Sequence, residues 1–238
     1  MAEYIVEAND LLKRYNSSSV ALDGLNIKLE KGKIIGLLGP NGSGKTTFIK
    51  ILAGLLTPTG GEVFIDGNRP GVETKAIVSY LPERPYFNSW MKVSQCLDFF
   101  EDFYDNFDRS VAEAMLNDLG VPLDALLKTL SKGTKEKVQL VLVMSRKAKL
   151  YLLDEPIAGV DPAAREYILN TIIGNYNREA TILISTHLIT DVEDTLDQFL
   201  FINGGKVLYG GDVKTIKETQ GMSLDAYFRE VFRCSRSY

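Results

Sequence analysis

The sequence predicts an α/β fold in which helices cover a mostly parallel sheet. After about residue 145, short apolar runs alternate with helical segments, and such alternation is typical of a parallel sheet because its connections must cross back over the faces. A glycine-rich loop directly follows one apolar run and precedes a helix. Neither a repeat nor a linker divides the 238 residues, so we expect one domain spanning 1–238.

The first part of the chain has strand character. Short runs of β-branched and other apolar residues are bounded by turn-forming residues. These runs are Tyr4–Val6, Ile27–Leu29, Ile34–Leu38 and Val63–Ile65.

From Val93 to Met144 the pattern becomes helical. Phenylalanines recur there at intervals of three and four residues, which is the spacing of one helix face. They are Phe99, Phe100, Phe103 and Phe107. We therefore predict an inserted helical subdomain at about 86–145.

The remaining elements follow in alternation. Lys149–Leu153 and Ala180–Ser185 are apolar strands, and Asp161-Pro162 between them is typical of a helix start. Asn203-Gly204-Gly205 predicts a hairpin turn.

Composition excludes several classes of protein. The net charge of −4 argues against a nucleic-acid-binding protein, so no nucleic-acid partner is expected. The N-terminus lacks the pattern of a signal peptide, and no apolar run approaches the ~20 residues that span a bilayer. Cys96 and Cys234 have no metal-binding spacing, which favours free thiols in a reducing compartment. We expect a cytoplasmic protein that reaches the membrane only through a partner.

Residues 39–46 fit the phosphate-binding pattern Gly-x4-Gly-Lys-Ser/Thr, between the strand Ile34–Leu38 and a helix predicted at Thr47–Leu55. Glycines let the backbone wrap closely around a phosphate, and the helix N-terminus contributes a positive dipole end. Lys45 is expected to reach the β- and γ-phosphates, and the Thr46 hydroxyl to bind Mg²⁺. The predicted nucleotide-binding residues here are Gly39, Pro40, Asn41, Gly42, Ser43, Gly44, Lys45, Thr46 and Thr47.

Two carboxylates and the single histidine complete the predicted catalytic site. Asp154 and Glu155 end an apolar strand, at the sheet edge where nucleotides bind in α/β proteins. Asp154 is suited to the Mg²⁺ environment and Glu155 to activating a water. His187 follows the apolar strand Thr181–Ile184, which is expected to end at the same edge. The alternatives are that the acids only cap a turn and that the histidine is a structural hydrogen-bond donor.

The ordered set of motifs resembles the ATP-binding-cassette (ABC) ATPase family over nearly the whole chain. The discriminating element is Leu130-Ser131-Lys132-Gly133-Thr134, because kinases and small GTPases lack it. The other motifs, in family order, are Tyr15, 39–46, Tyr80-Leu81-Pro82-Glu83, Asp154-Glu155, Ala158-Gly159-Val160-Asp161 and His187.

The resemblance implies a P-loop NTPase of the ABC type, with an N-terminal antiparallel β subdomain and the inserted helical subdomain. It implies ATP and Mg²⁺ as cofactors, with Tyr15 stacking on adenine and Glu83 joining Thr46 and Asp154 near the metal. Ser131 and Gly133 would contact the γ-phosphate of ATP held by a second ABC ATPase subunit. Asp161 would communicate across that dimer, in which Lys45, Glu155 and His187 are the catalytic residues.

Two positions depart from the family pattern. Lys132 and Thr134 replace the second glycine and the glutamine of Leu-Ser-Gly-Gly-Gln, as in bacterial exporter ATPases with Ser-Lys-Gly. Glu83 stands where the family usually has glutamine, which adds a negative charge beside the phosphates.

The chain most resembles a stand-alone exporter ATPase subunit that drives a separate polytopic membrane permease. The alternative is an ATP-switched regulatory module acting on a soluble partner. For the phenylalanines the choice lies between subdomain core and partner surface. The loop residues Tyr86, Phe87, Trp90 and Met91 are predicted to dock the permease, since loops lie at the surface.

Overall fold

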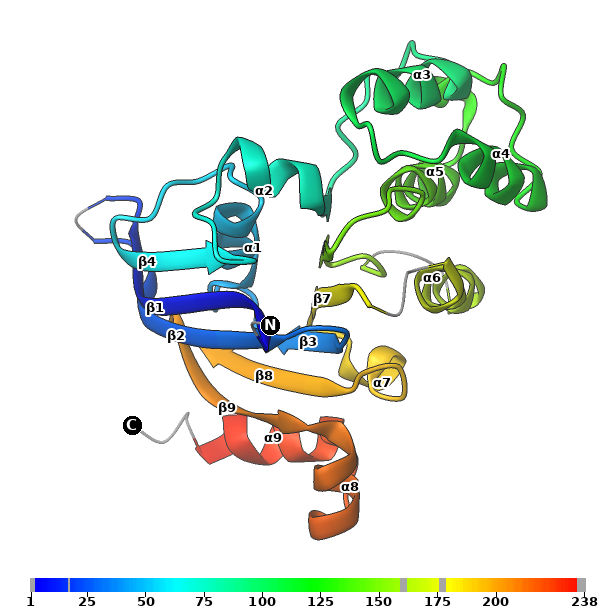
Figure 1. Ribbon diagram of the computed structural model, residues 1–238. Helices are drawn as coiled ribbons and strands as arrows, with labels where there is room; N and C mark the ends of the chain where they lie inside the picture. Colours follow the sequence, from blue (N-terminus) through cyan, green and yellow to red (C-terminus); the bar gives the residue numbers. More distant parts are fainter. Residues whose placement is uncertain (1–2, 17, 159–161, 176–178, 235–238) are drawn as a thin grey trace.

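The computed structural model describes residues 3–16, 18–158, 162–175 and 179–234 (Figure 1). Its first sheet is antiparallel, with the strand order β2–β1–β4. The strands are β1 (Tyr4–Arg14), β2 (Val20–Glu30) and β4 (Gly60–Ile65). Asp10 has a φ of 47° and lies at a register shift, which lets β1 bend and stay paired well beyond the predicted Tyr4–Val6. The antiparallel β subdomain is confirmed.

The second sheet has six strands in the order β5–β6–β7–β3–β8–β9. Every neighbouring pair from β5 to β8 is parallel, and only β9 runs antiparallel to β8. The predicted hairpin turn is present at Gly204 and Gly205, both with positive φ. The mostly parallel sheet is thus confirmed. Its strands are β3 (Ile34–Leu38), β5 (Val78–Leu81), β6 (Leu150–Asp154), β7 (Thr181–Thr186), β8 (Gln198–Asn203) and β9 (Lys206–Asp212).

The central strands are buried on both faces, so they read as continuous apolar runs. In β3, Ile35 and Leu37 pack into the core shared with the antiparallel sheet and α1 (Lys45–Leu52). Ile34 and Leu38 point the other way, into the core shared with the helical region. Because successive side chains of a strand point to opposite faces, β3 lies between two cores. Its carboxyl end leads directly into the loop 39–44.

Helices α3 (Val93–Phe103), α4 (Arg109–Asp118) and α5 (Lys132–Met144) form the arm at the upper right of Figure 1. Of these, α5 packs against α3, α4, β5 and α6 (Pro162–Asn175). The other helices are α2 (Val72–Ile77), η1 (Leu127–Thr129), α7 (Ile189–Val192), α8 (Val213–Gln220) and α9 (Leu224–Cys234). No helix in these described ranges is both long and apolar enough to cross a membrane.

Two local predictions differ from the structure. The helix expected at Thr47–Leu55 begins at Lys45 and ends at Leu52, because the chain turns at Gly54, where φ is 69°. The helical phenylalanine series breaks after Phe103, so Phe107 lies outside α3. The helix ends there because Tyr104 is extended, and the next helix begins only after Asp108, which caps α4 by accepting a hydrogen bond from the Val111 amide.

Candidate functional site

The loop 39–44 joins the carboxyl end of β3 to the first turn of α1. A Cβ atom at Gly39 would lie 2.3 Å from the Ile202 carbonyl oxygen, and one at Gly44 would lie 2.6 Å from that of Ala21. Gly44 also has a φ of 110°, so both close approach and backbone conformation require glycine there. The first amides of α1 have no intrahelical acceptor, which suits this end of the helix to bind an anion.

Lys45 is the buried cation of this loop, with only 5% of its surface exposed. Its ammonium group donates hydrogen bonds to the carbonyl oxygens of Gly39 at 2.8 Å and Pro40 at 3.2 Å. It also lies 3.6 Å from Oε1 of Glu155. Burial lowers the pKa of Lys45, and the charge of Glu155 opposes that shift. The structure therefore brings the predicted phosphate-binding lysine and the predicted base together.

Asp154 lies at the end of β6 and is 1% exposed, and its two carboxylate oxygens differ in their contacts. Its Oδ1 accepts hydrogen bonds from the hydroxyls of Thr46 at 3.1 Å and Ser185 at 2.6 Å. Its Oδ2 is buried and has no hydrogen-bond partner in the part of the chain that the structure describes. Burial raises the pKa of Asp154. A buried carboxylate oxygen without a donor, beside a threonine hydroxyl, is an arrangement that fits a hard divalent cation such as Mg²⁺.

Glu155 occupies a strained turn directly after β6. Its φ is 50°, a left-handed conformation that non-glycine residues adopt at some cost. The Glu155 amide donates to the backbone oxygen of Ser185 at 3.0 Å and to its hydroxyl at 3.1 Å, which holds the turn. Its Oε2 lies 3.0 Å from Nδ1 of His187. The side chain is thus placed between Lys45 and His187.

Ser185 is the residue that sequence reasoning missed. It is fully buried at the end of β7, and its hydroxyl contacts both Asp154 and Glu155. The available signal was a polar residue closing an apolar strand just before His187. That signal alone does not reveal the partners, because they follow from the alignment of β7 beside β6.

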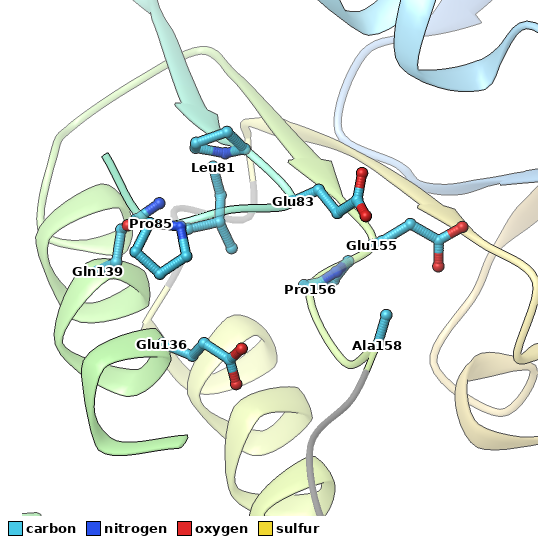
Figure 2. Close-up of a pocket in the computed structure, with 9 residues that line it drawn as sticks. Leu81, Glu83, Pro85, Glu136, Gln139, Glu155, Pro156 and Ala158 are labelled. Carbon is cyan, nitrogen blue, oxygen red and sulfur yellow. The ribbon is translucent and has the colours of Figure 1, made fainter. Parts of the chain in front are cut away.

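Glu83 lies close to this site but makes no hydrogen bond that the structure gives for it. Figure 2 shows its carboxylate extending in the same direction as that of Glu155, from the pocket that both residues line. Burial raises the pKa of Asp154, and the charges of Glu155 and Glu83 raise it further. Burial lowers the pKa of Lys45, and the charge of Glu83 is the smallest of the effects that oppose this shift. Glu83 is therefore placed to influence a bound metal through its charge.

Tyr15 directly follows β1 and lies beside the start of α1. Its hydroxyl is 3.2 Å from the Thr47 hydroxyl, which anchors the tyrosine beside the first turn of α1. The residue remains 55% exposed, so its ring is accessible to a planar ligand. This position is compatible with base stacking next to the phosphate loop.

The signature residues lie on a different element. Ser131 caps α5, accepting a hydrogen bond from the Thr134 amide at 3.1 Å, and it is exposed. α5 packs against the helical region and β5, whereas α1 packs against β6 and β2. No described hydrogen bond joins Ser131 or Gly133 to the loop; the hydrogen bonds of the Ser131 hydroxyl are to Thr134. Asp161 lies outside the described residues.

Comparisons with known proteins agree on one family. The sequence model of the ABC transporter family matches residues 22–158. The uncharacterized ABC transporter ATP-binding protein YdbJ of Bacillus subtilis (strain 168) is 33% identical over 236 residues, covering 91% of this chain and 74% of that protein. The SkfA peptide export ATP-binding protein SkfE of the same organism is 29% identical over 210 residues, covering 86% and 87%. A solved ATP-binding subunit of an ABC transporter superposes with a TM-score of 0.83 at 28% identity, covering 96% of this chain and 99% of that one.

Proposed function

The chain belongs to the ABC transporter family and is its ATP-binding, ATP-hydrolysing subunit, and from this premise we propose that it closes as a dimer around two Mg·ATP to drive a separate membrane permease. The observation that carries the proposal is the position of Glu155. Its carboxylate lies 3.6 Å from the Lys45 ammonium and 3.0 Å from Nδ1 of His187, at the mouth of the phosphate loop.

This geometry supports a division of roles in hydrolysis. The Lys45 ammonium, the loop amides and the α1 N-terminus bind the phosphates. Glu155 accepts a proton from the water that attacks the γ-phosphorus, and the bond from that phosphorus to the leaving ADP oxygen breaks. His187 holds the Glu155 carboxylate. Thr46 and Asp154 would hold Mg²⁺, which when bound neutralises phosphate charge.

Dimerisation is supported by the position of the signature residues within a single chain. The exposed Ser131 and the half-buried Gly133 lie at the N-terminus of α5, whose main packing partners are α3, α4, α6 and β5. A second subunit can present this helix end to the nucleotide of the first. Each site would then consist of one loop and the partner's signature, and hydrolysis would require both subunits.

A groove between the nucleotide core and the helical region supports the proposal that a membrane partner binds this chain. We call it the subdomain groove; it has a volume of about 840 Å³. Its apolar lining comes from α1 and the turn after it, from α2 and from α3, and includes Leu55, Val72, Phe99 and Phe103, all exposed. Soluble monomers rarely keep such a patch without a partner. The phenylalanine series is therefore divided: Phe100 belongs to the core, and Phe99 and Phe103 form a surface.

The predicted docking loop contributes only partly to this groove. Tyr86 lines it and is 49% exposed. Phe87 and Met91 pack, partly buried, against the core. Trp90 is 62% exposed but does not belong to the groove lining. We therefore assign docking to the groove, with Tyr86 as the loop's contribution.

Export is the direction we propose. The ATP-binding protein SkfE, of which this chain covers 87%, is named for peptide export, and the Ser-Lys-Gly signature resembles that of bacterial exporter ATPases. A likeness to a bacterial exporter with ATP bound, at 20% identity and a TM-score of 0.79, shows the shared fold.

The experiment that tests the proposed function is Glu155→Gln in the full chain. An amide keeps the shape and can still contact His187 but cannot accept the proton, so we expect hydrolysis to fall by roughly 10²-fold or more. ATP binding should persist, and the variant should elute as an ATP-dependent dimer on gel filtration. Wild-type turnover would assign the base to another residue, and a variant that binds ATP but stays monomeric would contradict the proposed dimer.

A further inference from the structure

A single buried hydroxyl, that of Ser185, contacts both carboxylate residues at the end of β6. Ser185 is fully buried in β7 and lies opposite Asp154, its paired residue in the neighbouring strand. Its hydroxyl donates a hydrogen bond to Oδ1 of Asp154 at 2.6 Å and accepts one from the Glu155 amide at 3.1 Å. A serine hydroxyl has one donor hydrogen and two acceptor lone pairs, so both bonds can form at the same time.

The bond to Asp154 determines which of its carboxylate oxygens remains available. Thr46 donates to the same Oδ1 at 3.1 Å, so both hydroxyl donors contact one oxygen. The other oxygen, Oδ2, is buried and has no donor in the described ranges. Thr46 is itself expected to bind Mg²⁺, whereas no ligand is expected for Ser185. Ser185 is therefore the donor that can hold the Asp154 carboxylate in one orientation, with Oδ2 left for Mg²⁺.

The bond from the Glu155 amide acts on the backbone. Glu155 has a φ of 50°, and a non-glycine residue keeps such a conformation only where surrounding contacts fix it. Its amide is shared between the hydroxyl of Ser185 at 3.1 Å and the carbonyl oxygen of the same residue at 3.0 Å. This turn places the Glu155 carboxylate 3.6 Å from the Lys45 ammonium and 3.0 Å from Nδ1 of His187. A change in the turn would move the carboxylate relative to both groups.

Thr181, at the other end of β7, is a buried hydroxyl residue with a purely structural environment. It is fully buried, like Ser185. Its hydroxyl also makes two hydrogen bonds, accepting from the Gly32 amide at 3.0 Å and donating to the Glu30 carbonyl oxygen at 3.1 Å. These partners are backbone groups where β2 ends and the chain turns into β3, and neither belongs to the nucleotide site. The same strand thus contains two comparable hydroxyls with different partners.

We propose that Ser185 is a positioning residue for ATP hydrolysis, whose one hydroxyl fixes the carboxylate of Asp154 and the backbone turn of Glu155 together. This inference rests on the roles proposed for Asp154 and Glu155 in hydrolysis, and it adds a residue that acts only through them. Because one group supports both residues, its removal should impair metal binding and turnover at the same time. Loss of a residue that orients metal ligands typically lowers metal affinity or activity about 10–100-fold.

The test compares Ser185→Ala with the matched control Thr181→Val in the full chain. Each change removes a buried hydroxyl with two hydrogen bonds from β7, so both should lower the stability that urea unfolding measures. Calorimetry gives the ATP affinity in EDTA and in Mg²⁺, and steady-state assays give kcat at saturating Mg·ATP. For Ser185→Ala we expect an unchanged affinity in EDTA, with the gain in affinity from Mg²⁺ and kcat each reduced about tenfold or more. Thr181→Val should change none of these three quantities.

Ser185→Thr keeps the hydroxyl and should restore most of the Mg²⁺ effect and of kcat. If Ser185→Ala folds poorly, Ser185→Cys replaces it, because a thiol has a similar size but is only a weak donor, and the same losses are expected. Wild-type values in Ser185→Ala, or equal losses in Thr181→Val, would overturn the inference. If Glu155→Gln is inactive while Ser185→Ala turns over at the wild-type rate, the proposed base stands and only the positioning role is wrong.

Discussion

At the scale of single residues, the site consists of a few buried polar groups, and these differ in how completely hydrogen bonds and ion pairs satisfy them. Lys45 is almost fully buried but has carbonyl and carboxylate partners, whereas one oxygen of Asp154 has no donor among the described residues. Buried polar groups are costly unless they are hydrogen-bonded, so these positions indicate ligand binding rather than stability.

Lys45→Ala should weaken Mg·ATP binding strongly. The substitution removes a charge-assisted contact inside a closed loop, where such contacts are among the strongest, and we expect a loss of at least about tenfold in affinity. Calorimetric titration with Mg²⁺ present measures it. Unchanged affinity would show that 39–46 does not bind the nucleotide.

Asp154→Asn should stabilise the nucleotide-free protein while abolishing activity. Burial raises the pKa of Asp154 in the folded state, so the stability associated with its protonated form is present at low pH and lost as the pH rises through that folded pKa. A neutral amide avoids this loss, and we expect a gain on the order of 1 kcal/mol near pH 8 that shrinks toward pH 4. Thermal unfolding at both pH values measures it. A variant less stable at the higher pH would contradict the account of the orphaned oxygen.

At the scale of elements, one side chain connects the helical region to the sheet. Arg146 follows α5, yet its guanidinium reaches the last turn of α2 and the start of β5. Asn106, between α3 and α4, accepts from its Nε and donates to the Ala76 carbonyl. These bonds fix where the arm meets the sheet edge that leads to Glu83.

Arg146→Ala should destabilise the fold by roughly 2–4 kcal/mol, because it leaves a cavity and several buried carbonyls without donors. Arg109→Ala is the matched control. It removes three ion pairs, but these lie at the surface and are screened, so we expect about 1 kcal/mol or less. Urea unfolding of both variants measures the difference, and an equal loss would contradict the assignment of Arg146 as the connecting residue.

At the scale of the whole molecule, two regions with separate cores enclose the subdomain groove. Such an arrangement can transmit closure of the nucleotide site to a bound partner, because α1 extends from the phosphate loop to the groove. Leu52 at the end of α1 and Leu55 just after the helix line the groove, and the other end of α1 is at Lys45.

Phe103→Ala should disrupt assembly with the permease while basal ATPase activity survives, because this exposed ring lies in the groove and outside the nucleotide site. Trp90→Ala is the control, since Trp90 is similarly exposed but outside the groove lining. Copurification of the membrane subunit measures assembly. Loss with Trp90→Ala but not with Phe103→Ala would move docking to the loop 86–91. Met91 is unsuitable for this test because it packs against the core.

The sequence by itself determined the local chemistry of the chain. The loop 39–46, the strand ending in Asp154-Glu155 and the order of the motifs sufficed for the family, since each depends on residues adjacent in sequence. Only the tertiary structure decided which distant residues meet. It placed Ser185 against both carboxylates, joined Glu155 to Lys45 and His187, and divided Phe100 from Phe103. Strand alignment and helix packing set these contacts, and neither can be predicted from the spacing of residues along one segment.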